Sequence, residues 1–167
     1  APWVSDSNTN LEIHPPFADA GGPYVGNAGE AISLSGSVVD EGGGFITYEW
    51  DLDGEGSYDD STIQNPTASF PGGVLTIKVK VTDSQGGEGF AETDVVALTI
   101  SNLTGQVYDG LSKSVTVTVV SPYETVTTYA GSLTPPVNAA SYAVEVSVKD
   151  GATVLETLIG YTLVVDK

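Results

Sequence analysis

Apolar and polar residues alternate with a period of two along most of this chain, and this pattern constrains the fold more than any other feature. Successive side chains of a β-strand point to opposite faces, so the alternation predicts strands that bury one face only. The clearest runs lie in 75–81, 115–119 and 142–148. Clusters of Gly, Pro, Asn and Asp separate the runs, as turns require. No segment has a convincing helical period, so the sequence predicts an all-β protein made of antiparallel β-sandwiches.

The length of 167 residues allows one large domain or two of immunoglobulin size, and the distribution of charge favours two. Residues 1–100 hold 16 acidic residues and two lysines, whereas residues 101–167 hold six acidic residues and three lysines. We therefore expect a linker over residues 1–14, a first sandwich over residues 15–101 and a second sandwich over residues 102–167.

The connections between strands also follow from the sequence. The last strand of the first unit, Phe90–Ile100, leads almost directly into the second unit. A few residues near Ser101–Leu103 would then join two modules in line, without a flexible Gly/Ser linker. In the second unit, where we expect six or seven short strands, Asp150–Gly151 predicts a two-residue hairpin turn.

Composition excludes several classes of function. The formal net charge is −17, with five lysines and no arginine, so the chain repels nucleic acid and anionic membranes. There is no cysteine, which rules out disulfides, thiol catalysis and thiolate metal sites. No apolar run approaches the roughly 20 residues that cross a bilayer. We expect neither nucleic-acid binding nor membrane insertion.

The stretch WDLDGEGSYDD, residues 50–60, concentrates five carboxylates without a basic residue among them. Alternate oxygen ligands followed by a glycine are typical of a Ca²⁺-binding loop, to which a backbone carbonyl also contributes. The bidentate Glu expected at the twelfth position is missing, because Thr62 stands there. The other interpretation is an exposed acidic turn. The predicted Ca²⁺ ligands are Asp51, Asp53, Glu55, Ser57, Asp59 and Asp60.

Two families are recognisable in longer motifs. Residues 16–100 resemble the polycystic-kidney-disease (PKD) repeat through ADAGGPYVGNAGE, ITYEWDLDGEG and VTDSQGG. Residues 108–165 resemble the YDG-type (MBG) repeat of large bacterial surface proteins through YDGLSKSVTVTV, NAASYAV and GYTLVV, although Ala140 replaces a glycine usual in that family. Both resemblances imply tandem immunoglobulin-like sandwiches that are extracellular and non-catalytic.

The PKD resemblance suggests a second and weaker Ca²⁺ site. Some PKD-like modules of secreted hydrolases bind Ca²⁺ with acidic residues from the turns after the second and sixth strands and from the linker that enters the domain. The matching residues here are Asp40, Glu41 and Asp83, but Gly42 stands where a further Asp is expected. Asp83 also suits an ordinary Asx turn, which is the alternative interpretation.

Support for catalysis is thin. His14 is the only histidine and falls in the expected linker, so no Ser/His/Asp triad can be built. Among the aromatic residues, Tyr48 and Trp50 alternate inward and should be core. Trp3, Tyr58 and Tyr123 are candidates for exposed rings that could stack on a sugar, and the other interpretation is that they are packing or interdomain residues.

The sequence therefore predicts non-catalytic spacer or adhesion modules of a large secreted or cell-surface bacterial or archaeal protein, stiffened by Ca²⁺. Their partners would be neighbouring β-sandwich modules of the same chain, and also a cell-surface glycan or protein. The alternative is a carbohydrate- or protein-binding accessory of a secreted hydrolase. Exposed aromatic residues across one sheet would favour that alternative, and a short rigid junction with termini at opposite ends would favour the spacer.

Overall fold

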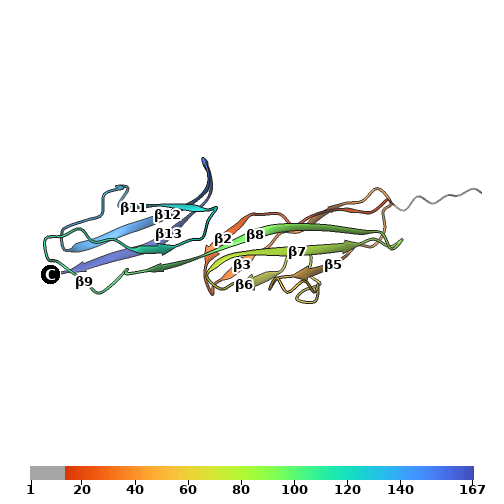
Figure 1. The fold of residues 1–167 in the computed structure, drawn as a ribbon, viewed down its shortest axis with the longest axis horizontal. Helices are drawn as coiled ribbons and strands as arrows, with labels where there is room; N and C mark the ends of the chain where they lie inside the picture. The colour runs from red at the N-terminus through yellow and green to blue at the C-terminus, as the bar shows by residue number, and fades with distance from the viewer. Residues whose placement is uncertain (1–13) are drawn as a thin grey trace, which may run out of the picture.

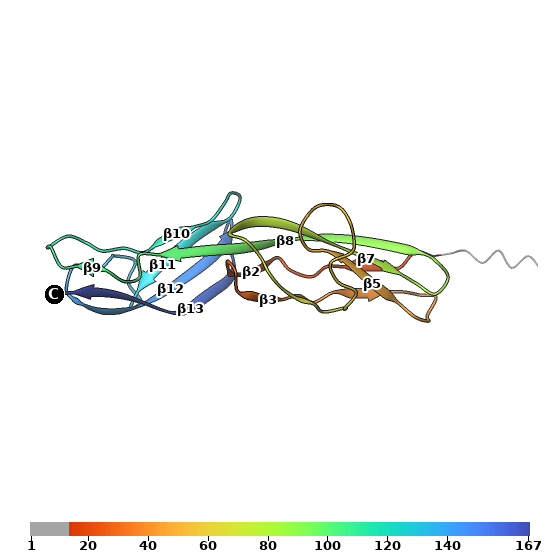
Figure 2. The same ribbon diagram turned by 90° about the horizontal axis from the view of Figure 1, so that it is seen from below.

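The computed structural model describes residues 14–167, which form strands and turns without any helix (Figure 1). The all-β prediction is confirmed. The described chain is elongated, and its first residues lie at the opposite end from the C-terminus (Figures 1 and 2). Of the expected linker, residues 1–13 lie outside the described part, and His14 is exposed.

The first half is a two-layered sandwich. One layer has the strand order β8-β7-β5, with β2 paired in parallel to β8, and the other layer contains the antiparallel pairs β1–β4 and β3–β6. The strands of this half are β1 (Phe17–Asp19), β2 (Tyr24–Asn27), β3 (Ala31–Ser33), β4 (Ser37–Val39), β5 (Thr47–Asp51), β6 (Thr67–Ser69), β7 (Gly73–Thr82) and β8 (Glu88–Ser101).

The core of this sandwich follows the alternation seen in the sequence. Ile77, Val79 and Val81 of β7 are fully buried, while the residues between them are partly exposed. Trp50 is also fully buried and Tyr48 nearly so, which confirms that both belong to the core. Ala18, Ile32, Leu34 and Phe70 close the core from the other layer.

The second half has five strands of its own and borrows the end of β8. One sheet has the order β11-β12-β13-β9, in which β9 pairs in parallel with β13, and β10 pairs with the last residues of β8. The strands are β9 (Gln106–Val107), β10 (Thr116–Thr118), β11 (Glu124–Tyr129), β12 (Ala140–Asp150) and β13 (Thr153–Asp166). Val144, Val146, Val148 and Leu163 form the centre of the second core.

Two local details differ from the sequence prediction. The alternation of Ile32, Leu34 and Val38 predicts one strand, but the structure has two, β3 and β4, in different pairs. The strand is interrupted around Gly36, where a Cβ would lie 2.7 Å from the Trp50 ring and 2.9 Å from the Gln64 carbonyl oxygen. The turn of the β12–β13 hairpin lies one residue later than expected, because Asp150 still pairs with Thr153. Gly151, with φ 55°, supplies the left-handed conformation of that turn.

Strand β8 runs through both halves and gives one face to each core. Val95 and Ala97 belong to the first core, whereas Val96 and Leu98 belong to the second. Farther along the strand, Ile100 pairs with Val117 of β10. Each large apolar side chain buried in this way contributes roughly 1.5–3 kcal/mol. The two halves therefore share a strand.

Polar contacts strengthen the same junction. The Tyr123 hydroxyl donates a hydrogen bond of 2.9 Å to Asp94 Oδ2, while Thr76 Oγ1 donates one of 2.8 Å to Asp94 Oδ1. A second hydrogen bond also joins the two halves: the Tyr161 hydroxyl of β13 donates to Asn27 Oδ1 of β2 at 2.5 Å. Burial and the contact with Asp94 raise the pKa of Tyr123 to about 12, so it stays a neutral donor at physiological pH.

Candidate functional site

The acidic stretch forms a loop that begins at the end of β5 and projects beside β5 and β7 (Figures 1 and 2). Its base is closed like a hairpin: the Trp50 amide donates to the Ser61 carbonyl at 2.9 Å, and the Asp60 amide donates to the Trp50 carbonyl at 3.0 Å. Gly54, with φ 78°, provides one of the left-handed bends that the loop requires. The loop is therefore held at both ends by the sheet.

Three of the six predicted ligands come together in this loop. Asp51, Asp53 and Asp60 each offer a carboxylate oxygen, and these oxygens lie within 4.8 Å of one another. Asp51 is fully buried and Asp53 and Asp60 are exposed, so the group opens to solvent on one side. Glu55 and Asp59 are exposed and stand outside this group, and Ser57 is exposed on the same loop.

Backbone amides already hold the three carboxylates in place. Asp51 accepts hydrogen bonds from Gly54 and Gly56, at 2.7 and 2.9 Å. Asp53 accepts one from Glu55 at 2.9 Å, and Asp60 one from Leu52 at 2.6 Å. Each carboxylate oxygen has two lone pairs, so oxygens that accept one amide can still bind a hard cation. The geometry suits a divalent cation that takes its remaining ligands from water.

The second predicted cluster is not assembled in the same way. Asp83 is buried and its Oδ1 accepts the amides of Gln85 and Gly87, at 2.7 and 2.8 Å, which is the Asx-turn arrangement. Asp40 Oδ1 accepts the Gly42 amide at 3.1 Å, and its Oδ2 is buried without a hydrogen bond. Within residues 14–167, Asp40, Glu41 and Asp83 do not form a close group of three carboxylates.

The outer face of the β5-β7-β8 sheet carries a further set of side chains. Register places Glu49, Lys80 and Phe90 in one row across the three strands. Lys80 Nζ lies 2.6 Å from Glu49 Oε2, and this hydrogen bond raises the pKa of the lysine. Tyr58, from the acidic loop, packs against Phe90 with ring centroids 5.9 Å apart. A groove of about 730 Å³ lies beside this row.

Comparison with known families gives the identity of the fold. The model of the PKD domain matches residues 13–100, which is more than half of the chain. The chain belongs to the PKD domain family. The model of the MBG domain matches residues 96–154, so a PKD module is followed by an MBG module, as the sequence motifs predicted. The two matches overlap within β8, the strand that both modules share.

Several solved structures are similar to this chain. The crystal structure of the PKD1 domain of Vibrio anguillarum Epp is 26% identical, with 50% of this chain and 96% of that chain covered and a TM-score of 0.39. A structure of carbohydrate-binding modules from the β-sandwich superfamily is 17% identical, with coverages of 81% and 54% and a TM-score of 0.41. Bacteroides ovatus SGBP-B in complex with a mixed-linkage heptasaccharide is 13% identical, with coverages of 92% and 48% and a TM-score of 0.36. No curated protein matches the sequence.

PKD and MBG domains are typical of extracellular or cell-surface proteins and are typically non-catalytic modules. Within residues 14–167 no helix is long and apolar enough to cross a membrane.

The aromatic residues of the PKD–MBG pair are placed partly as expected. Tyr58 is half-buried on the outer sheet face. Tyr123 is buried at the junction, so it is an interdomain residue, as the second interpretation held, and not an exposed ring. The hydrogen bond to Asp94 explains this burial, since it satisfies the hydroxyl group. Trp3 lies outside the described residues. The sequence motifs did not identify Phe90 as a candidate binding residue. Its signal is that it alternates with Glu92 and Asp94 on the solvent-facing side of the strand, where an aromatic residue is unusual.

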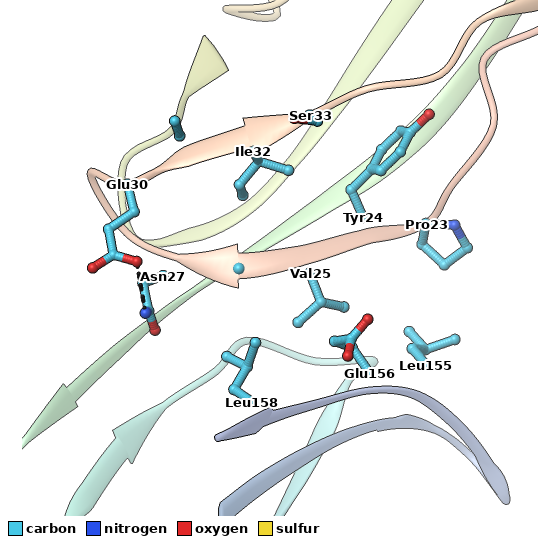
Figure 3. Close-up of a pocket in the computed structure, with 12 residues that line it drawn as sticks. Pro23, Tyr24, Val25, Asn27, Glu30, Ile32, Ser33, Leu155, Glu156 and Leu158 are labelled. Atoms are coloured by element: carbon cyan, nitrogen blue, oxygen red, sulfur yellow. Dashed lines mark hydrogen bonds between the residues drawn. The ribbon is translucent and has the colours of Figure 1, made fainter. Parts of the chain in front are cut away.

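A second hollow, of about 370 Å³, lies between the PKD and MBG modules (Figure 3). Its walls come from β2 and β3 on one side and from Leu155, Glu156 and Leu158 of β13 on the other. Figure 3 shows the Val25 side chain directed from β2 toward these β13 residues, and Asn27 donates a hydrogen bond of 3.0 Å to Glu30 at the rim. Val25 and Leu158 both pack against the second core, so this hollow is part of the junction.

Proposed function

We propose that this PKD–MBG pair is a stiff, non-catalytic spacer within an extracellular or cell-surface adhesive protein. The observation that carries the proposal is β8, which passes from one module into the next without a linker. A shared strand with apolar side chains on both faces leaves no free hinge, because bending would expose Val96 and Leu98 to water. The described residues begin and end at opposite poles, as a spacer requires (Figure 1).

Distance measurement between spin labels tests the stiffness. The chain has no cysteine, so two labels can be placed without background by Phe45→Cys in the PKD module and Leu133→Cys in the MBG module, both exposed. The expected result of double electron–electron resonance is a single narrow distance distribution. A labelled pair that also carries Val96→Asp is the control, because a charge at the junction should broaden the distribution. A broad distribution in the parent pair would contradict the proposal.

The proposal includes Ca²⁺ bound by the loop of residues 51–60 in the PKD module. Three carboxylates within 4.8 Å repel one another, and a hard divalent cation relieves that repulsion. Asp51, Asp53 and Asp60 would bind it, with water and loop carbonyls completing the shell. Few protein ligands imply weak binding, with a dissociation constant of about 10⁻⁴–10⁻³ M. Bound Ca²⁺ would hold the projecting loop against the sheet and so add stiffness near β5.

Melting with and without a chelator is the first test of this site. A reversible rise of the melting temperature on adding CaCl₂, absent with NaCl of equal ionic strength, is expected. If the melting temperature does not change, the loop is an exposed acidic turn held by its own backbone amides.

A further inference from the structure

The outer face of the β5-β7-β8 sheet joins the second core at Val74, Val96 and Leu98. Farther from the junction this face is polar except for two aromatic rings. The row Glu49, Lys80 and Phe90 adjoins a second row, formed by Thr47, Thr82 and Glu88. Glu49 and Lys80 of the first row, the whole second row and Thr62 line most of a groove of about 730 Å³. Its size falls in the range of about 300–1,000 Å³ usual for small-ligand sites.

Two aromatic rings, Phe90 and Tyr58, lie outside the lining of the groove but next to Lys80, which is part of that lining. Phe90 is 56% exposed, so much of its apolar ring contributes no hydrophobic stabilisation to the fold. Tyr58 is inclined by 59° to Phe90 and lies 5.8 Å from Lys80 Nζ. The acidic loop thus places a second ring above the sheet next to the first. A sugar ring presents apolar C–H faces and hydroxyl edges, so aromatic rings beside polar side chains provide for both.

The polar side chains of the groove suit hydroxyl groups. The hydroxyls of Thr62 and Thr82 can donate and accept, and the Glu88 carboxylate accepts strongly. The Thr47 hydroxyl donates to the Thr82 carbonyl at 3.4 Å and Glu49 is paired with Lys80, so these two groups offer their remaining lone pairs. The backbones of β7 and β8 pair with each other, but β5 is the last strand of its sheet, and Thr47, Tyr48 and Glu49 of β5 line the groove. An extended peptide that adds a strand to this edge is therefore the competing occupant, and a peptide probe in the experiment below tests it.

Charge narrows the class of ligand. Lys80 is paired with Glu49, and Glu88 and Glu92 lie on the same face in a chain of net charge −17. A polyanion such as a uronic-acid or sulfated polymer would be repelled.

We propose that the groove beside Phe90 and Tyr58 binds a short segment of a neutral polysaccharide. The sugar stacks on the exposed aromatic rings, and its hydroxyls hydrogen-bond to the threonines and to Glu88. The site lies on the side of the module, so it would let a spacer attach to a glycan along its length. The sugar does not contact Ca²⁺ in this site, so its binding does not require the metal.

Affinity electrophoresis, followed by calorimetry on any binder, tests the proposal with the whole chain. The probes are xylan, galactomannan and hydroxyethylcellulose as neutral polymers, polygalacturonate as the anionic polymer, and gelatin as the extended peptide. The expected result is retardation by at least one neutral polymer and by neither of the others. Phe90→Ala should weaken binding by about tenfold or more, equivalent to roughly 1.4 kcal/mol. Tyr58→Ala should act in the same direction.

Phe17→Ala is the matched control, because Phe17 is an equally large ring, 76% exposed, on β1 in the opposite layer. It should bind as the parent does. Trp50 fluorescence melting checks that each variant is folded, since Trp50 lies in the core beneath this face. The proposal is overturned if no neutral polymer binds, if only gelatin or polygalacturonate binds, or if folded Phe90→Ala binds as tightly as Phe17→Ala. Repeating the titration in chelator separates this site from the Ca²⁺ proposal, since the sugar should still bind.

Discussion

A substitution in the MBG core should destabilise the PKD module as well, because β8 belongs to both. Leu163 of β13 is fully buried in the second core, together with Val96 and Leu98 of β8. Leu163→Ala removes most of a buried side chain and should cost about 2–5 kcal/mol of unfolding free energy. If 167 residues unfold as one unit, each kcal/mol lowers the melting temperature by about 2–4 °C. The expected decrease is therefore about 4–20 °C.

The tryptophan distribution makes this coupling measurable. The chain has two tryptophans, Trp3 and Trp50, and the MBG module has none. In a Trp3→Phe background the fluorescence reports only Trp50, deep in the PKD core. Leu163→Ala should shift the Trp50 transition by the full amount and keep it coincident with the transition seen by circular dichroism. Ile159→Ala, at an exposed position of the same strand, should shift it hardly at all. A Trp50 transition that stays in place in Leu163→Ala would show that the modules unfold independently.

Two further outcomes are expected. At free Ca²⁺ about ten times the dissociation constant, binding should add about 1.4 kcal/mol, or about 3–6 °C in melting temperature, and Asp53→Asn with Asp60→Asn should abolish this shift. The exposed pair Glu55→Gln with Asp59→Asn should keep the Ca²⁺-induced shift. If this pair loses the shift and the Asp53/Asp60 pair keeps it, the metal binds elsewhere in the loop. The raised pKa of Tyr123, about 12 against 10.0, stabilises the fold fully below pH 10 and progressively less as the pH rises from 10 through 12. Urea unfolding across this pH range should show a smaller loss of unfolding free energy in Tyr123→Phe than in the parent. Some loss remains in the variant, because the pKa values of Tyr48 and Tyr161 are also raised. Equal losses in the two proteins would contradict the role of Tyr123.

The alternation was sufficient to predict the long strands. In β7 and β12 a single period-two run fills one face with apolar residues, most of them β-branched, so the fold class followed directly from the sequence. Short strands were harder, because β3 and β4 are separated by a glycine whose role depends on Trp50 and Gln64, both distant in the sequence. The sharing of β8 was also hidden: Val95 to Leu98 are four consecutive apolar residues, and periodicity cannot show that their two faces belong to different cores.

The candidate sites were predictable to different degrees. The spacing of Asp51 and Asp53 predicted the acidic loop, but only the structure shows which carboxylates lie together. Asp60 lies next to Asp51 because its amide donates a hydrogen bond to the Trp50 carbonyl. Glu55 stands outside the group, which spacing alone could not show. The row Glu49, Lys80 and Phe90 depends on strand register across three segments, so it became visible only with the sheet assembled.

The parallel strand pairs have a mechanical consequence. In the PKD module the early strand β2 lies parallel to the last strand β8, from Tyr24 opposite Val95 to Asn27 opposite Leu98, and in the MBG module β9 lies parallel to β13 in the same sense. When tension pulls the two ends of the chain apart, the paired strands are drawn in opposite directions along their own axes. The hydrogen bonds between them are then loaded together in shear, and they cannot be opened one after another as in unzipping. A tether built in this way resists extension at both modules, and the continuous backbone of β8 transmits the load from one to the other.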